Sequence, residues 1–179
     1  CGRPRKSTFE KAINYALKLT NNHNNFYPLI YKEFLKAGVI FVILPNLSGS
    51  KINGATKKIG SSVLLMVNDR RTFADTFWFT LFHEIGHIIN GDFGVTIDDK
   101  CNNKEDIADK YAENILISPE KYTIFLKKNR FDKESIKTFA KEIDRDPGIV
   151  LGRLQNEGKV KYNDWRLQSL KQKYKIILN

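Results

Sequence analysis

Two uninterrupted apolar runs lie in the N-terminal half of the chain. Residues 39–44 (VIFVIL) and 62–67 (SVLLMV) are each followed by a turn-forming residue. Apolar runs of this length, rich in branched side chains and bounded by turn formers, are typical of buried strands. Turn-forming sequences also lie between the runs, at Ser48-Gly49-Ser50 and Asn53-Gly54. The pattern therefore predicts a small, mostly antiparallel sheet of about three strands.

The remaining sequence has the spacing of helices. Apolar residues surround almost the whole helical wheel of residues 73–89, which is typical of a buried helix. Ser7 and Glu10 match a capping box at the start of the first helix. Amphipathic spacing and stop signals predict the other helices at about 7–20, 28–36, 104–117, 122–128, 133–143, 147–156 and 164–174. Helices, then a small sheet, then more helices predict an α+β fold with a helical C-terminal half.

The buried helix carries a pair of histidines. His83 and His87 are four residues apart, so their imidazoles project from one face of the helix and can bind one metal ion. Glu84 borders that face, where its carboxylate can take a proton from a metal-bound water. Imidazole and carboxylate ligands suit Zn²⁺, which lowers the pKa of its water to about 7. Burying these side chains unpaired would cost several kcal/mol, so a zinc site explains them better than an ordinary core helix does.

A catalytic zinc site needs a third protein ligand. On the next predicted helix, Glu105 and Asp109 lie one turn apart on the same face. We expect Glu105 to bind the metal and Asp109 to accept a hydrogen bond from a ligand histidine. His23 is the sole histidine outside the motif. The competing carboxylates, less well placed by their spacing, are Asp92, Asp98, Asp99, Asp106 and Glu113.

The composition indicates a globular protein that does not insert into a membrane. The chain of 179 residues is 41% apolar and 28% charged, which is ordinary for one globular domain. No apolar run approaches the roughly 18 residues of a membrane span, so we expect no membrane insertion. The two cysteines, Cys1 and Cys101, are too few for a disulfide framework and are expected to be free thiols. Together with the lack of a secretory signal, they indicate a cytoplasmic location.

The net charge of +10 is compatible with nucleic-acid binding. The lysines are spread over the predicted surface helices, however, and form no basic block or aromatic-interleaved motif. Solubility is the simpler explanation of the charge, and we expect no direct contact with nucleic acid. Residues 1–6 have the composition of a linker, and residues 7–179 are expected to form the domain.

Two segments resemble the motifs of a known family, the ImmA/IrrE metallopeptidases, especially the type attached to HigA or Xre-like helix-turn-helix regulators. They are residues 77–88 (FWFTLFHEIGHI) and 105–112 (EDIADKYA). Shorter segments are similar as well, so the resemblance extends over about residues 29–172; these segments are 37–39, 54–56 and 147–155.

The resemblance implies a gluzincin-like zinc site. His83, His87 and Glu105 match the metal ligands, Glu84 matches the catalytic base, and Asp109 matches the residue that supports a ligand histidine. Members of this family are often encoded beside, or fused to, DNA-binding regulators that they cleave or control. The chain would then be a fragment of a longer protein with an N-terminal DNA-binding domain.

We therefore predict a cytoplasmic zinc endopeptidase whose protein substrate is a DNA-binding regulator of the repressor or antitoxin type, with a toxin or antitoxin as a further partner. Glu84 would assist the attack of zinc-bound water on a peptide bond. One alternative is a non-catalytic zinc sensor or binding module of a helix-turn-helix transcription regulator. Another is direct binding of nucleic acid. The intact Glu84 favours the peptidase, because a structural zinc site needs no general base.

Several residues outside the proposed metal site could contact substrate or metal, although simpler explanations exist for most of them. If the strand at 62–67 lies at the sheet edge beside the metal, it could hold an extended substrate by strand addition. Arg70 and Arg71 are candidate substrate contacts, although solvated surface charge explains them as well. Cys101 could approach the zinc as a thiolate, but a bystander role is the simpler interpretation. Tyr111 is expected to be a core residue.

Overall fold

The chain forms one mixed sheet with helices before and after it. The computed structural model describes residues 4–45, 52–68, 73–97 and 103–174. Its helices are α1 (Lys6–Lys18), α2 (Phe26–Lys36), α3 (Ala74–Asn90), α4 (Asn103–Leu116), α5 (Pro119–Lys127), α6 (Lys133–Glu142) and α7 (Pro147–Asn156), with short 3₁₀ turns at Leu19–Asn21 and Gln168–Leu170. Its strands are β1 (Val39–Leu44), β2 (Ile52–Ile59), β3 (Ser62–Asn68) and β4 (Gly94–Ile97). The fold is therefore α+β, as the hydrophobic pattern predicts.

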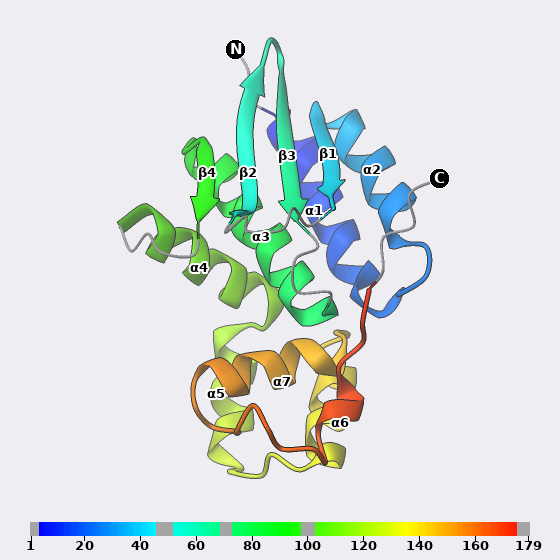
Figure 1. Cartoon of the computed structure of the whole chain (residues 1–179), viewed down its shortest axis with the longest axis vertical. Helices are drawn as coiled ribbons and strands as arrows, with labels where there is room; N and C mark the ends of the chain where they lie inside the picture. Colours follow the sequence, from blue (N-terminus) through cyan, green and yellow to red (C-terminus); the bar gives the residue numbers. More distant parts are fainter. Residues whose placement is uncertain (1–3, 46–51, 69–72, 98–102, 175–179) are drawn as a thin grey trace.

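Helices cover one face of the sheet, and a second group of helices lies below it (Figure 1). Figure 1 shows α1 and α3 behind the strands, α2 next to β1, α4 below β4, and α5, α6 and α7 grouped underneath. Alternate residues of β3 are buried toward these helices, namely Val63, Leu65 and Val67. This alternation is the period-2 pattern of a strand with one covered face.

The sheet differs from the predicted one in two respects. Its order is β1-β3-β2-β4, with β3 parallel to β1, and β2 antiparallel to both β3 and β4. The expectation of about three strands is therefore too low, because β4 was not foreseen in its short, Gly-containing sequence. The strand at 62–67 lies inside the sheet in β3, so the condition for strand addition at this segment, a position at the sheet edge, is not met.

The turn between β2 and β3 is also not where it was predicted. Asn53 and Gly54 lie within β2, and the chain instead reverses at Gly60 and Ser61. Gly60 has a φ of 57°, which glycine adopts with little strain. Pairing with strands on both sides outweighs the local turn preference of the Asn-Gly pair. The other predicted turn, at Ser48 to Ser50, lies outside the described residues.

Helix α3 is the central helix of the molecule. It contacts β2 and β3 on one side and α4 and α7 on the other. Most of its residues are buried, including His83, Glu84 and His87. The helix ends at Gly91, which has a φ of 76° and donates backbone hydrogen bonds to the last turn, as the Asn90-Gly91 stop predicts. Among the described residues, no helix is both long and apolar enough to cross a membrane.

The helices of the C-terminal half begin with side-chain caps. Ser118 caps α5, Asp132 caps α6 and Asp146 caps α7, each by accepting a hydrogen bond from a backbone N–H of the first turn. Pro119 and Pro147 occupy first-turn positions, where the missing N–H is not needed. These three helices follow their predicted positions closely.

The prediction of a helix at 164–174 is wrong. This segment contains a 3₁₀ turn and then an extended tail, in which the carbonyl of Gln172 accepts a hydrogen bond from the N–H of Ala74 at 2.9 Å. Lys171 Nζ lies 2.9 Å from Asp75 Oδ2, and the Trp78 indole donates to the Tyr174 hydroxyl at 2.9 Å. The amphipathic spacing of the tail favours a helix, but contacts with α3 decide its conformation.

The start of α1 also differs from the prediction. The helix begins at Lys6 and its N-cap is Arg5, with no side-chain capping bond, so the capping box of Ser7 and Glu10 is not formed. Arg5 N instead donates to the carbonyl of Ala37 at 3.1 Å. The backbone just before α1 is therefore held by the end of α2.

Candidate metal centre

Three donor groups from two helices converge between α3 and α4. His83 and His87 come from α3 and Glu105 comes from the first turn of α4, with potential ligand atoms all within 4.8 Å of one another. His83 Nε2 lies 3.0 Å from His87 Nε2 and 3.2 Å from Glu105 Oε2, and His87 Nε2 lies 3.6 Å from Glu105 Oε1. The three residues expected to share one ion are thus brought together by the fold.

The separation of these atoms fits a tetrahedral metal site. Zinc bonds to nitrogen and oxygen at tetrahedral angles place neighbouring donor atoms about 3.4 Å apart. The observed separations of 3.0, 3.2 and 3.6 Å lie on both sides of that value. A cation placed where the three atoms converge would be held by both imidazoles and by the Glu105 carboxylate.

Asp109 orients one of the histidines. Its Oδ1 lies 2.7 Å from Nδ1 of His83, and as a carboxylate it accepts the ring N–H. In the neutral ring the lone pair is then on Nε2, the atom that faces His87 and Glu105. A carboxylate behind a ligand histidine is the usual support of a zinc site. The arrangement agrees with the role predicted for Asp109.

The two histidines have pKa values displaced in opposite directions. Burial lowers the pKa of His83, but the hydrogen bond to Asp109 and the negative charges of Glu84, Asp109 and Glu105 outweigh it, so the net pKa lies above its ordinary value. The pKa of His87 is lowered, first by burial and then by the neighbouring His83. His87 therefore favours the neutral form that binds metals, and the surplus of carboxylates around His83 attracts a cation.

A close approach of α3 and α4 brings the ligands within reach of each other. A Cβ added to Gly86 would lie 3.2 Å from Cα of Ala108 and 3.2 Å from Cδ1 of Tyr111. Gly86 therefore allows the α4 backbone to lie against α3, and Ala108 is fully buried in this contact. Tyr111 packs against the core, and burial raises the pKa of its hydroxyl, in line with the expected core role.

Glu84 lies on the side of α3 that faces the sheet. It is completely buried, and its side chain occupies the space in front of Gly54 on β2. Its negative charge contributes to the raised pKa of His83. The sequence pattern assigns Gly54 to a turn and gives it no role in the site, although a glycine inside a strand is a known sign of a close approach by another group.

The remaining candidates do not join the three donor groups. His23 bonds through its two ring nitrogens to Tyr174 and Asp146, each at 3.1 Å. Asp92 pairs with Lys104 at 2.8 Å, and Asp106 is exposed. The pKa of Glu113 is raised by burial, and this residue lies near Arg153. Five candidates fall outside the described residues: Arg70, Arg71, Asp98, Asp99 and Cys101.

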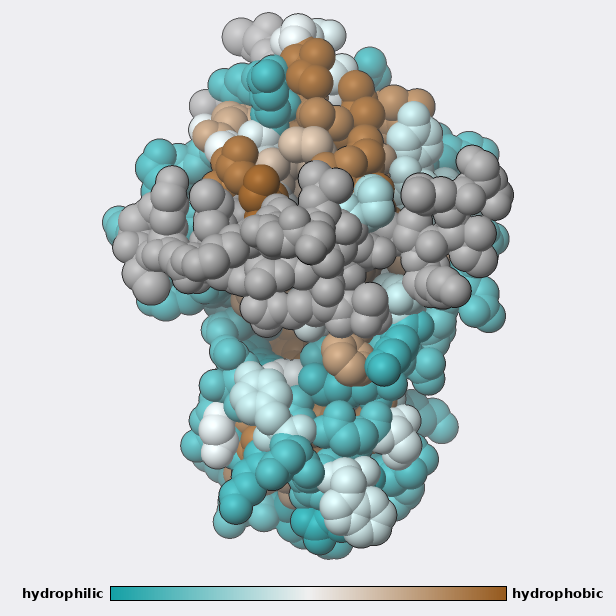
Figure 2. Space-filling model, viewed as in Figure 1, coloured by the Kyte–Doolittle hydropathy of each residue, from teal (hydrophilic) through white to brown (hydrophobic). Residues whose placement is uncertain are grey.

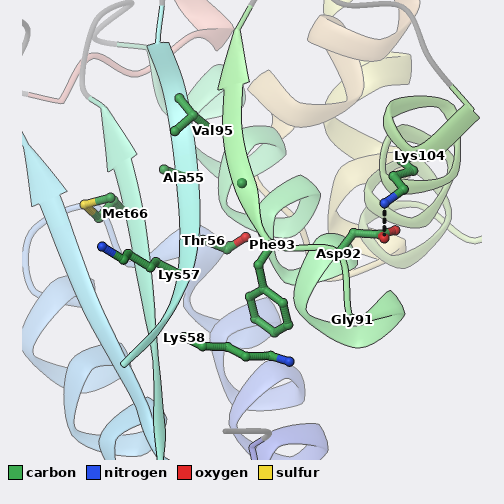
Figure 3. Close-up of a pocket in the computed structure, with 11 residues that line it drawn as sticks. Ala55, Thr56, Lys57, Lys58, Met66, Gly91, Asp92, Phe93, Val95 and Lys104 are labelled. Carbon is green, nitrogen blue, oxygen red and sulfur yellow. Dashed lines mark ion pairs between the residues drawn. The ribbon is translucent and has the colours of Figure 1, made fainter. Parts of the chain in front are cut away.

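A small cavity adjoins the donor groups, and it shares lining residues with a larger groove. The cavity of about 80 Å³ is lined by His87, Glu105 and the segment 92–95 that leads into β4. The same segment and Lys104 also line an open groove of about 670 Å³ on the outer face of the sheet. Figure 3 shows the side chains of this groove, with Phe93 near its centre and Lys58 beside it. Sequence reasoning did not single out either residue, since nothing in their spacing marks them.

The groove has an apolar floor. Met66, Ala55 and Val95 occupy one register row across β3, β2 and β4, so their side chains lie on the same face of the sheet. Figure 2 shows apolar residues gathered over this part of the sheet. The Lys58 ammonium lies 4.6 Å from the centre of the Phe93 ring.

Comparison with known proteins identifies no family for this chain. No known protein family matches its sequence, and no curated protein matches it either. The likeness to the ImmA/IrrE metallopeptidases therefore remains a prediction based on the two motifs. The function must be argued from the geometry of the site.

The division of roles between Glu105 and Asp109 can be measured. We expect Asp109→Ala to weaken zinc binding by about 10–100-fold, because it removes only the support of His83. Glu105→Ala should weaken it further, because it removes a ligand. Competition with a chromogenic chelator measures both affinities, and His23→Ala is the control that should bind zinc as wild type does. Equal losses in the two carboxylate variants would contradict the assignment.

Proposed function

We propose that this chain is a zinc-dependent endopeptidase of the ImmA/IrrE type that acts on a regulatory protein. The observation that carries the proposal is the convergence of His83 Nε2, His87 Nε2 and the Glu105 carboxylate, with Glu84 buried on the same helix next to His83. This set contains three ligands, one position left for solvent or substrate, and one extra carboxylate. A purely structural zinc site uses four protein ligands and needs no such carboxylate.

Each residue of the site has a separate task. A bound Zn²⁺ would supply a Lewis acid that polarises the substrate carbonyl and makes a water molecule more acidic. Glu84 would accept the proton of the attacking water and pass it to the leaving amine. Asp109 would hold the His83 ring in the tautomer that binds the metal. The low-dielectric surroundings of α3 strengthen these interactions, because water is largely excluded there.

The substrate would be an extended segment of polypeptide. Within the described residues β4 is the last strand of the sheet, and its first residues line the same cavity as His87 and Glu105. An extended peptide that pairs with the outer edge of β4 would run past the donor groups. Its alternate side chains would then reach the groove of Figure 3, where Met66, Val95 and Phe93 offer apolar contacts.

The non-catalytic alternative draws support from one observation, the complete burial of Glu84. A sensor or binding module needs no access of solvent or substrate to that carboxylate, whereas a peptidase needs the site to open when substrate binds. The two proposals differ in whether any peptide bond is broken.

Mass spectrometry of digests separates the two proposals. The zinc-loaded chain is incubated with helix-turn-helix regulators as candidate substrates, and with β-casein as an unstructured probe. We expect discrete fragments of one regulator that do not form in the presence of a chelator. If every regulator stays intact while the chain binds one of them, the sensor proposal replaces the peptidase.

The charge of the groove predicts a preference for acidic segments. Its charged lining residues among those described are Lys57, Lys58, Lys104 and Asp92, and the last two form an ion pair. Lys58→Glu should therefore raise KM for an acidic peptide by about 5-fold, the range of a partly screened charge pair, and leave KM for a neutral peptide unchanged. Lys121→Glu, an exposed change on α5, is the control. An unchanged KM for the acidic peptide in Lys58→Glu, or an equal rise in KM for both peptides, would contradict the prediction.

A further inference from the structure

Gly54 lies directly opposite Glu84 in the layer between the sheet and α3. In β2 it pairs with Val67 of β3 and with Thr96 of β4, next to a register irregularity between Ile52 and Gly54. Val67 is fully buried toward the helices, and residues paired across neighbouring strands share a face. The position that a side chain of residue 54 would occupy is therefore on the face of the sheet that packs against α3.

The space in front of Gly54 is occupied by the Glu84 side chain. A Cβ built on Gly54 would lie 2.6 Å from both Cγ and Cδ of Glu84, closer than real Cβ contacts come. The contact involves the stem of the glutamate as well as its carboxylate, so rotation of the carboxylate alone cannot relieve it. Any other residue at position 54 would have to displace Glu84 or separate β2 from α3.

The backbone does not require a glycine at this position. Gly38, Gly60, Gly91 and Gly158 have positive φ values, whereas Gly54 does not. Its special property is therefore the absence of a side chain and not an unusual conformation. Gly94 on the neighbouring strand gives the contrast, because a Cβ added there meets nothing within 4 Å. The requirement for glycine at 54 is thus specific to the place where Glu84 lies.

We propose that Gly54 is a positioning residue for Glu84: its missing side chain forms the cradle that holds this side chain on the sheet-facing side of α3, the helix that carries His83 and His87. The catalytic part of the inference rests on the proposed peptidase function, while the steric part does not. Van der Waals contact requires carbon atoms about 3.5–4.0 Å apart, so a methyl group at position 54 displaces the glutamate stem by about 1 Å. A displacement of that size at a reacting group can cost about 10²-fold in rate.

A double-variant cycle on thermal unfolding tests the steric part without any activity assay. Gly54→Ala should lower the Tm by about 4–10 °C, as overpacking does in a chain of this size. In a Glu84→Ala background the same change should alter the Tm by less than about 2 °C, because the added methyl enters the space that the glutamate leaves. Gly94→Ala is the matched control and should keep the wild-type Tm. Equal Tm losses from Gly54→Ala in both backgrounds would overturn the proposal.

Peptide hydrolysis by the zinc-loaded chain tests the catalytic part. Gly54→Ala should lower kcat by about 10²-fold, with KM and zinc content close to wild type, because the metal ligands and the outer groove are not displaced. Hydrolysis is measured well below the Tm of the variant. An unchanged kcat would overturn the positioning role. If wild type hydrolyses nothing, the peptidase proposal fails, and the Tm cycle still decides whether Gly54 holds Glu84 in place.

Discussion

Glu84→Gln is expected to abolish most of the peptidase activity and leave the metal site intact. A positioned general base contributes about 10²–10⁴-fold to the rate, and the amide can no longer accept the proton of the attacking water. The ligand atoms belong to His83, His87 and Glu105, so zinc should bind as before. Three measurements on the same preparations test this result: kcat on the regulator substrate, zinc content by elemental analysis, and the Tm.

Two outcomes would contradict this assignment. Cleavage at the wild-type rate by Glu84→Gln would mean that the activity does not use this carboxylate. Loss of zinc in Glu84→Gln would mean that the residue is needed for the metal site itself, and the division between base and ligands would be wrong. Glu120→Gln, a change on α5, is the matched control and should behave as wild type.

Addition of Zn²⁺ to the metal-free chain is expected to raise its thermal stability strongly. A ligand at about 1,000 times its Kd stabilises the folded state by about 4 kcal/mol, if the unfolded chain does not bind it. For a chain of this size that corresponds to a Tm increase of about 8–16 °C. The increase has a structural reason, because one ion would link α3 with α4 and would pair the buried imidazoles with a charge. Thermal unfolding followed by circular dichroism at fixed free zinc measures it.

The Glu105→Ala variant is the matched test of this effect. It lacks the ligand from α4 and should show a much smaller increase in Tm with zinc. Mg²⁺ should have little effect on wild type, because it prefers a shell of oxygen ligands to imidazoles. A full Tm increase in Glu105→Ala, or an equal increase with Mg²⁺, would refute the proposed site.

The sequence predicted most elements whose signals are local. The apolar runs correspond to β1 and β3, the fully apolar wheel corresponds to α3, and Ser118-Pro119 separates α4 from α5. The four-residue spacings of His83 with His87 and of Glu105 with Asp109 placed each pair on one helix face. Helix spacing and the need for a third ligand predicted that the two pairs meet, and the resemblance to a known family implied the same. In the structure they do meet, in bonds of His83 to Glu105 and Asp109.

Interactions between distant segments explain where sequence reasoning went wrong. The Asn53-Gly54 pair has a strong turn preference, yet it lies in β2, where Gly54 pairs with strands on both sides. The tail at 164–174 has helical spacing, yet it is extended at Lys171 and Tyr174 because these two residues bond to α3. Local propensities amount to tenths of a kcal/mol per residue, and several tertiary contacts together exceed them.

The sequence by itself thus determined the chemistry of this protein: which side chains can bind a metal, and on which helix faces they lie. Only the tertiary structure decided the order of the strands, the position of β4 beside His87 and Glu105, and the contact of Gly54 with Glu84. The physical reason is that helix periodicity is a property of neighbouring residues, whereas strand order and close approach depend on which distant surfaces pack together. The sequence shows that residue 54 is a glycine, but only the structure shows that the Glu84 side chain fills the space in front of it.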